Sequence, residues 1–169
     1  MSDKTKTKLK TLRNDIIIVL ITIISTFLFS KYVIGITIVC GVSMMDTYQN
    51  SDVLMTKKFN LNPERFDVVV FKAEIEYYLI KRTIGLPGET VRIDTDGNIY
   101  INGEILEENY GREKIQEPGL AIEEVTLGED EYFVMGDNRN NSIDSRSSAV
   151  GVLKKHDLIG IIFLSKKSK

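Results

Sequence analysis

The sequence predicts a mostly β protein that carries one membrane-spanning helix at its N-terminus. Three observations predict this fold class. An uncharged run over residues 16–30 is the one convincingly helical segment. After it, short runs of β-branched and apolar residues alternate with turn residues at close intervals, which is typical of antiparallel sheets. The 169 residues, 43% hydrophobic and 27% charged, suffice for an anchor and one modest domain.

The uncharged run lies between Asp15 and Lys31, and we predict a membrane anchor over residues 15–31. The run is short against the roughly 20 residues that a spanning helix needs, but Lys31 can extend its ammonium outward and Tyr32 can sit at the interface. A buried core helix is one alternative, disfavoured because the run has no polar face. A cleaved signal peptide is another, disfavoured because no small-x-small cleavage site follows.

Charge is unevenly distributed along the chain. Residues 1–31 hold six of the 22 basic residues but only two of the 24 acidic ones, so a basic tail precedes an acidic body. This asymmetry indicates how the chain is oriented in a membrane, and it does not indicate a nucleic-acid-binding surface. It places a tail, residues 1–14, in the cytoplasm and a body, residues 32–169, on the other side of the membrane.

The body reads as a series of short strands. The Asp96-Gly97 pair predicts a hairpin, because Asp-Gly between alternating strands favours a tight turn. The Glu-rich residues 104–124 have no clear period and are expected to form a surface excursion within a smaller inserted β-region at about 92–130. The expected strands are 33–40, 53–55, 67–71, 77–84, 90–93, 99–101, 132–135 and 158–164.

Cysteine and histidine usage argues against a metal centre. Cys40 is the single cysteine, so no intramolecular disulfide can form. His156 is the single histidine, and no cysteine cluster accompanies it. We predict no metal and no cofactor. His156 lies in a polar, lysine-flanked segment that suggests a turn, and a Ser–His pairing is kept as an alternative to the lysine chemistry described next.

Lys81 is the most informative residue of the body. It ends an apolar run, and in a strand it shares a face with Tyr77 and Leu79. If that face is the core side, burial lowers the pKa of the amine, by up to ~3–5 units at full burial. A lysine that is neutral near pH 7 can act as a general base. The alternative is an edge-strand lysine that points into water.

Ser43 is the nucleophile that such a base needs. It follows a strand and a glycine, Gly41, which lets a substrate approach the backbone closely. The backbone N–H of Ser43 is then an oxyanion donor. A polar loop serine is the alternative.

A third segment, residues 136–146, is dense in hydrogen-bonding groups. Asp144 and Arg146 are expected to pair if this loop packs against the body, and a generic solvated loop is the alternative.

Together these segments resemble the type I signal peptidases, membrane-anchored serine proteases that remove signal peptides from exported proteins. The resemblance implies the family's β-fold of short antiparallel sheets, and the short single anchor and Gly41 look like its Gram-positive branch. The motifs that carry it are V-x-G-x-S-M at 39–44, DVVVF at 67–71, IKRTIGLPGE at 80–89 and FVMGDNRNNS-x-DSR at 133–146.

The resemblance implies a serine–lysine dyad. Ser43 matches the nucleophile and Lys81 the general base, Ser142 the serine that hydrogen-bonds and orients the lysine amine, and Asp144 and Arg146 a supporting ion pair. The implied partners are the signal peptides of secreted preproteins, with a preference for Ala-x-Ala cleavage sites, and the lipid of the cytoplasmic membrane, with no nucleic acid. The implied location is a bacterial cell membrane, single-pass, with the catalytic body outside the cytoplasm.

The chain departs from the family pattern at three positions. Asp46 replaces a turn-fixing proline, and its carboxylate is expected to stabilise protonated Lys81 and raise its pKa. Gly41 stands where other members have a serine whose hydroxyl completes the oxyanion hole, so the second donor is open. Ser51 replaces a common glycine. Two rival readings follow: a membrane-tethered, non-catalytic or attenuated binding domain, and a self-cleaving repressor-type protease, whose DNA-binding domain this chain lacks.

Overall fold

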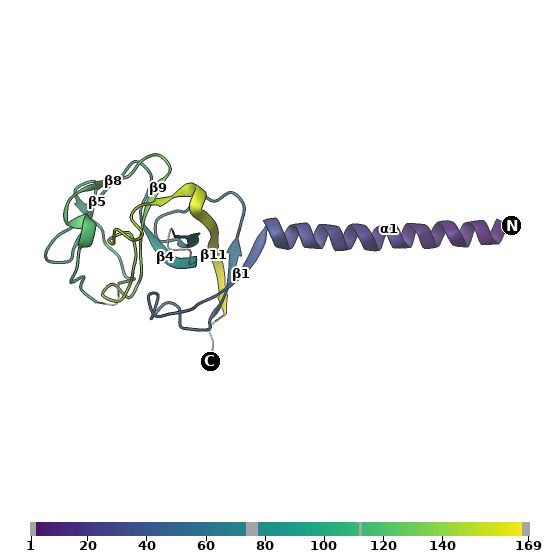
Figure 1. The fold of residues 1–169 in the computed structure, drawn as a ribbon, viewed down its shortest axis with the longest axis horizontal. Coiled ribbons are helices and arrows are strands. Elements are labelled where there is room, and N and C mark those ends of the chain that lie inside the picture. The colour runs from purple at the N-terminus through teal and green to yellow at the C-terminus, as the bar shows by residue number, and fades with distance from the viewer. Residues whose placement is uncertain (1–2, 74–77, 112, 167–169) are drawn as a thin grey trace.

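The computed structural model describes residues 3–73, 78–111 and 113–166, which form one α-helix and two antiparallel sheets (Figure 1). The helix α1 (Asp3–Tyr32) projects away from the β body. The mostly β fold class predicted from the sequence is confirmed. Tyr77, expected at the start of a strand, and residues 1–2 of the expected tail lie outside the described residues.

The helix α1 is longer than the predicted anchor. It begins at Asp3, so it contains most of the basic tail expected before residue 15. No Gly or Pro occurs there to interrupt it, and lysine is a good helix former. The 23 residues Lys10–Tyr32 are long and apolar enough to cross a membrane, and none of the span is buried. The alternative of a buried core helix is therefore wrong.

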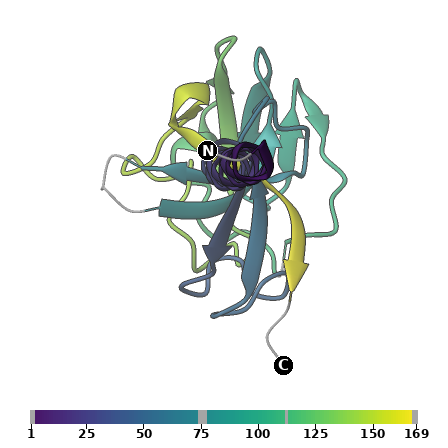
Figure 2. The same ribbon diagram turned by 90° about the vertical axis from the view of Figure 1, so that its right-hand side faces the viewer.

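The larger sheet has seven strands in the order β1-β2-β11-β3-β4-β9-β10, and neighbouring strands are antiparallel. The C-terminal strand β11 lies between β2 and β3, and the view along α1 shows it, in yellow, beside β2 (Figure 2). β4 and β9 are neighbours, which brings the chain after β9 beside the strand that carries Lys81. The strands are β1 (Ile34–Ile38), β2 (Val53–Lys57), β3 (Val68–Lys72), β4 (Tyr78–Gly85), β9 (Glu131–Met135), β10 (Leu153–Lys154) and β11 (Leu158–Lys166).

The smaller sheet has four strands in the order β7-β6-β5-β8. They are β5 (Thr90–Ile93), β6 (Ile99–Ile101), β7 (Glu104–Ile105) and β8 (Val125–Thr126). The hairpin predicted at Asp96-Gly97 is confirmed: β5 pairs with β6, and Gly97 has φ +78° and donates its N–H to Asp94 O. Two 3-10 helices, η1 (Gly119–Ile122) and η2 (Lys155–Asp157), lie in the connections.

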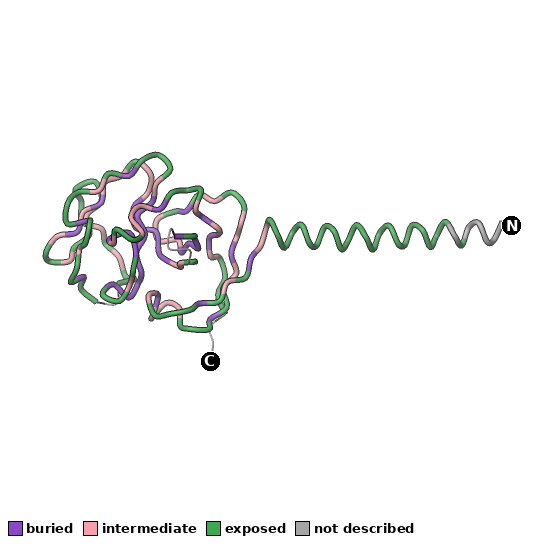
Figure 3. The backbone as a smooth tube through the Cα atoms, viewed as in Figure 1, coloured by how far each residue is buried: buried purple, intermediate pink, exposed green. Residues whose placement is uncertain are grey.

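Strand β9 separates two hydrophobic cores, because successive side chains of a strand point to opposite faces. Phe133 and Met135 belong to a core shared with the smaller sheet, whereas Tyr132 and Val134 belong to the core of the larger sheet. Each large apolar side chain that is buried contributes roughly 1.5–3 kcal/mol. In Figure 3 the buried stretches lie in the body, and the described side chains of the helix are exposed. Both faces of β9 are thus fixed where it leads into residues 136–146.

Candidate active site

Ser43 lies in the connection between β1 and β2, on a turn held by its own backbone. Met45 N–H donates to Val42 O at 3.1 Å, and Tyr48 N–H donates to Met44 O at 2.8 Å. Met44 is 2% exposed and packs into the body directly after the serine. The turn therefore cannot swing freely, and it presents the hydroxyl of Ser43 at a fixed place.

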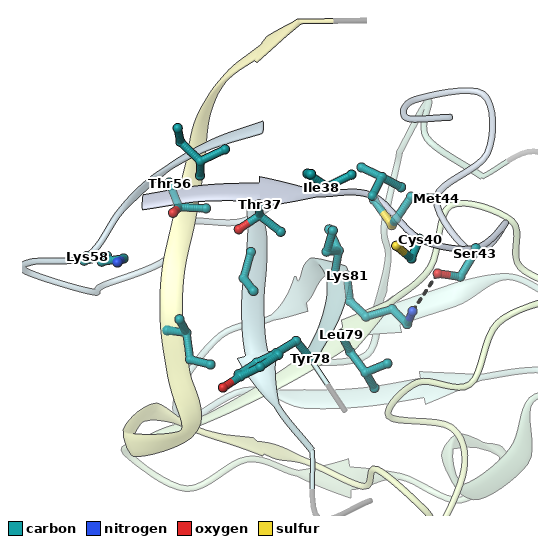
Figure 4. Close-up of a pocket in the computed structure, with 16 residues that line it drawn as sticks. Thr37, Ile38, Cys40, Ser43, Met44, Thr56, Lys58, Tyr78, Leu79 and Lys81 are labelled. Carbon is teal, nitrogen blue, oxygen red and sulfur yellow. Dashed lines mark hydrogen bonds between the residues drawn. The ribbon is translucent and has the colours of Figure 1, made fainter. Parts of the chain in front are cut away.

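Lys81 lies in β4, opposite Val69 of β3, and its side chain is buried. It is 2% exposed, so the edge-strand alternative is wrong. Its Nζ donates to Ser43 Oγ at 2.7 Å (Figure 4). The structure thus brings together the two residues that the sequence analysis proposed as nucleophile and base, 38 positions apart.

The surroundings of Lys81 favour its neutral form. Burial lowers the pKa of the amine from 10.5 to about 8, against the opposing charges of Asp144 and Asp137 and with a smaller lowering by Arg146. At a pKa of about 8, roughly one lysine in ten is unprotonated at pH 7. The sequence analysis expected Asp46 to raise this pKa, but the pKa is lowered, because burial outweighs the carboxylates around the amine, and Asp46 itself is exposed.

Asp46 has a structural consequence instead. Thr47 N–H donates to Met44 O at 3.1 Å, which closes a four-residue turn, and Asp46 occupies its third position with φ +83°. That position of a type II turn requires a positive φ, which proline, locked near −65°, cannot adopt. Ser51, the other departure at a backbone-sensitive position, has φ +75°. The turn over residues 42–47, called the nucleophile turn below after the proposed role of Ser43, is therefore incompatible with proline at position 46.

We expect Asp46→Pro to impair the protein and Asp46→Gly to be tolerated. Proline would force the turn beneath Ser43 to rearrange, lowering the free energy of unfolding by at least about 1 kcal/mol and displacing the nucleophile. Glycine adopts the observed φ without strain. Urea unfolding and peptide cleavage, measured on both variants, check this. A proline variant as stable and as active as the original chain would contradict the turn geometry.

The segment after β9 holds the nucleophile turn from the other side. Asn138 N–H donates to Ser43 O at 3.0 Å, and its side-chain Nδ2 donates to Val42 O at 3.1 Å. A Cβ on Gly136 would meet Ser43 O at 2.6 Å, so only glycine allows β9 to pass this close. The sequence analysis missed the role of Asn138; the density of hydrogen-bonding residues at 136–146 was the signal that pointed to it.

Asp144 and Arg146 form the buried ion pair that the sequence analysis expected. Arg146 Nε donates to Asp144 Oδ1 and Nη2 to Oδ2, both at 2.9 Å, and neither side chain is more than 7% exposed. Asp144 Oδ2 also accepts the N–H of Gly136 at 3.0 Å. The pair therefore fixes the loop against the end of β9. Among the charged groups that shift the pKa of Lys81, the carboxylate of Asp144 has the largest effect.

Ser142 lies in the same loop, and its Oγ is buried. Among the residues that the structure describes, this oxygen has no hydrogen-bond partner. The bond to Lys81 implied by the resemblance is not made here, and the lysine amine donates to Ser43 Oγ. The orienting role of Ser142 stays a prediction.

A second buried ion pair, which the sequence analysis missed, lies next to Lys81. Arg82 Nε donates to Asp137 Oδ1 at 2.8 Å and Nη2 donates to Asp137 Oδ2 at 2.6 Å. Thr47 Oγ1 donates to the same carboxylate at 2.5 Å, so the pair also holds the end of the nucleophile turn. The sequence signal was present, since Arg82 and Asp137 each stand in a resembling motif, but nothing local indicated that they pair.

A groove of about 470 Å³ opens beside the serine and the lysine (Figure 4). Its walls are mainly apolar and come from β1, from the start of β4 and from the chain leading to Ser43. Cys40 is exposed in this groove. Gly41 N–H donates to Asn50 Oδ1 at 3.1 Å and is not available as an oxyanion donor, whereas nothing among the described residues accepts the N–H of Ser43. The lining residues are Ile36–Gly41, Ser43, Met44, Thr56, Lys58, Val70, Tyr78–Lys81 and Ile159.

His156 does not take part in this site. It lies in η2, its side chain is 74% exposed, and its ring nitrogen is 3.6 Å from the carboxylate of Asp157. It lines a different hollow, together with Phe71 and Ala73. Within residues 3–73, 78–111 and 113–166, no group of three or more His, Cys, Asp or Glu side chains could hold a metal ion.

Comparison with known proteins identifies the family. A family model described as signal peptidase, peptidase S26, matches residues 12–165. A signal peptidase I of Bacillus amyloliquefaciens is 37% identical over 175 residues, covering 94% of this chain and 90% of the relative. Signal peptidase I S of Bacillus subtilis strain 168 is 36% identical, covering 86% of this chain and 80% of the relative. A crystal structure of a signal peptidase I from Enterococcus faecalis matches with a TM-score of 0.50 and 37% identity, covering 60% of this chain and 97% of that one.

The β scaffold and these matches define the class of protein as a serine protease. More narrowly, the chain belongs to the signal peptidase family, peptidase S26, and is a hydrolase of the signal peptidase I type. The resemblance drawn from the sequence motifs is confirmed. Its apolar N-terminal helix fits a single-pass membrane-anchored member of that family.

Proposed function

We propose that this protein is a membrane-anchored endopeptidase that removes signal peptides from exported preproteins, with Ser43 as nucleophile and Lys81 as general base. One observation carries the proposal: a buried amine lies 2.7 Å from a serine hydroxyl at the end of an apolar groove. The amine needs no further partner to act, because burial already lowers its pKa to about 8.

The chemistry follows from this geometry. Neutral Lys81 takes the proton of Ser43 Oγ as the oxygen attacks the scissile carbonyl carbon. The backbone N–H of Ser43 donates to the developing oxyanion. The ammonium of Lys81 then gives its proton to the leaving amine, which leaves an acyl-enzyme on Ser43. The lysine, neutral again, deprotonates a water that releases the acyl group.

The positions of the supporting residues agree with this mechanism. The negative charge of Asp144 acts on Lys81 and opposes the loss of its positive charge, while Arg146 holds that carboxylate in place. Ser142, buried beside Gly136, is the hydroxyl available to orient the amine once the bond to Ser43 is broken. These three residues position the dyad rather than react.

The groove supports a substrate in extended conformation. β1 is an edge strand of the larger sheet, and an extended segment can add to such an edge through backbone hydrogen bonds. The apolar walls accept small side chains such as those of an Ala-x-Ala site. Because the positive-inside rule places the basic N-terminal tail in the cytoplasm, the body lies outside, where signal peptides emerge. Sharing one membrane with the substrate raises the effective concentration of each.

The attenuated or non-catalytic alternative has no support in the site. It depended on a pKa of Lys81 raised by Asp46, but burial lowers this pKa to about 8. The hydrogen bond between Lys81 Nζ and Ser43 Oγ, formed with Asp46 in place, supports the catalytic proposal.

Replacing Ser43 with alanine tests the proposal. Cleavage of a preprotein by the full-length protein in detergent micelles is expected to fall by about 10³-fold or more, because no other group supplies the nucleophile. His156→Ala is the matched control, and its exposed ring predicts activity within about twofold of the original. Unchanged processing by Ser43→Ala would reject the assignment, and a large loss in His156→Ala would return the role of base to the histidine.

A further inference from the structure

The segment that follows β7 reaches from the smaller sheet to the residue next to Lys81. The ring of Tyr110 lies over the guanidinium of Arg82, with the Arg82 Cζ 3.7 Å from the ring centroid. The same ring contacts that of Phe66, with centroids 5.2 Å apart. Phe66 itself has φ +71°, a conformation that aromatic residues rarely adopt and that persists only where surrounding contacts hold it.

Arg82 donates four hydrogen bonds in the plane of its guanidinium, and three of them go to residues around the proposed active site. Nε and Nη2 hold Asp137, Nη2 also donates to Thr47 Oγ1 at 3.3 Å, and Nη1 donates to Phe66 O at 2.8 Å. These bonds hold the edge of the guanidinium but leave its faces uncovered. Tyr110 covers one of those faces and so fixes the plane in which the arginine holds Asp137 and Thr47.

Glu108, two residues before Tyr110, makes a corresponding contact with a second arginine, Arg139. Its carboxylate accepts from both Nη1 and Nη2 of Arg139, and the Nη2 bond is 2.7 Å long. Arg139 Nε donates to Gly136 O at 3.1 Å, and Arg139 O accepts from Arg146 Nη2 at 2.5 Å. Glu108 is thereby connected to the Asp144–Arg146 pair, whose carboxylate acts on the pKa of the lysine.

We propose that Glu108 and Tyr110 form a clamp by which the smaller sheet positions both halves of the Ser43–Lys81 dyad, through Arg139 and Arg82 respectively. The inference rests on the function proposed above. Tyr110 is 39% exposed, and the side chain of Glu108, 12% exposed, is held by an ion pair rather than by apolar packing, so neither belongs to a hydrophobic core. They contact two arginines instead. Arg82 directly follows Lys81 in the chain, and Arg139 directly follows Asn138, whose N–H donates to Ser43 O.

Steady-state kinetics of the full-length protein on a synthetic signal peptide test the clamp. Tyr110→Ala is expected to lower kcat by about 10- to 100-fold while KM stays within about twofold, because a displacement of about 1 Å in a catalytic group is enough for such a loss. Tyr110→Phe keeps the ring over Arg82, and its kcat is expected to equal that of the original chain. Glu108→Gln is expected to lower kcat in the same way. Ile105→Ala, an exposed apolar residue of β7 outside the clamp, is the matched control and should leave kcat unchanged.

The thermal midpoint of each variant is recorded, and activity is measured well below the lowest one. If Tyr110→Ala does not fold, Tyr110→Leu replaces it, since leucine packs against Phe66 but offers no π face to Arg82. Wild-type kcat in the alanine or leucine variant, an equal loss in Ile105→Ala, or failure of Tyr110→Phe to restore kcat would each overturn the clamp. The original chain and Ser43→Ala are assayed in parallel. If the original chain cleaves the peptide and Ser43→Ala does not, the proposed function stands whatever the clamp variants do. If neither protein cleaves it, both proposals are overturned.

Discussion

Replacing Lys81 with methionine is expected to abolish cleavage and, at pH 7, to raise the free energy of unfolding. Methionine has nearly the length of the lysine stem but no amine, so Ser43 loses its base. It also removes the cost of burying a group that is mostly charged at neutral pH. A loss of activity that coincides with a gain in stability separates a catalytic residue from one that merely maintains the fold.

The size and pH dependence of that gain follow from linkage. The pKa of Lys81 is about 8 in the folded chain, against 10.5 as the ordinary value, so the unfolded chain binds more protons between these two values. The stability of the original chain therefore rises with pH from about 8 to about 10.5, and below pH 8 it carries the full penalty, on the order of 3 kcal/mol. Urea unfolding of both proteins at pH 7 and pH 10.5 measures it. A methionine variant that is less stable at pH 7, or a difference that does not shrink with pH, would contradict the burial of the amine.

Replacing Asp137 with alanine is expected to lower the free energy of unfolding by about 3–5 kcal/mol, because Arg82 then stays buried without its carboxylate. Asp137 is not exposed at all, and the side chain of Arg82 is 5% exposed. Thr47 also loses its acceptor, so the nucleophile turn is released and cleavage falls with stability. Chemical denaturation followed by circular dichroism gives the change in free energy.

Two further variants make this prediction specific to a buried pair. Removing both partners, in Arg82→Met with Asp137→Leu, is expected to recover much of the lost stability, since no unpaired charge is left. Asp96→Ala breaks an ion pair with Lys114 whose side chains are 66% or more exposed, and it is expected to leave stability unchanged. Equal losses in Asp137→Ala and Asp96→Ala would show that the burial of Arg82 has no energetic consequence.

Local signals in the sequence located most strands correctly. The Asp96-Gly97 hairpin formed as expected because the turn residues and the alternation in both strands agree. The position of β11 between β2 and β3 was beyond sequence reasoning, since it depends on contacts between residues about a hundred positions apart. The start of α1 at Asp3 was missed because the predicted anchor began where the charged residues end. Lysine side chains do not interrupt a helix, so α1 begins before that point.

The same distinction applies to the candidate active site. Ser43 and Lys81 were proposed from the strand pattern and the motifs and lie within hydrogen-bond distance, and Asp144 and Arg146 pair as expected because they are close in sequence. The pairing of Arg82 with Asp137, 55 positions apart, was not found, because no chemical role predicted from the sequence linked the two residues. The expected rise of the pKa of Lys81 was wrong because burial of the amine outweighs the carboxylates around it, and closeness of Asp46 to the nucleophile in sequence does not reveal this balance.

The pH dependence of kcat/KM for signal-peptide cleavage by the full-length protein tests the central claim most directly, because it reports the ionisation of the base in the free enzyme. The account predicts an ascending limb with its midpoint at about 8, the pKa to which burial lowers Lys81. A midpoint near 10.5, the value of a lysine in water, or a rate that does not change between pH 6 and pH 9 would contradict a buried lysine acting as the base.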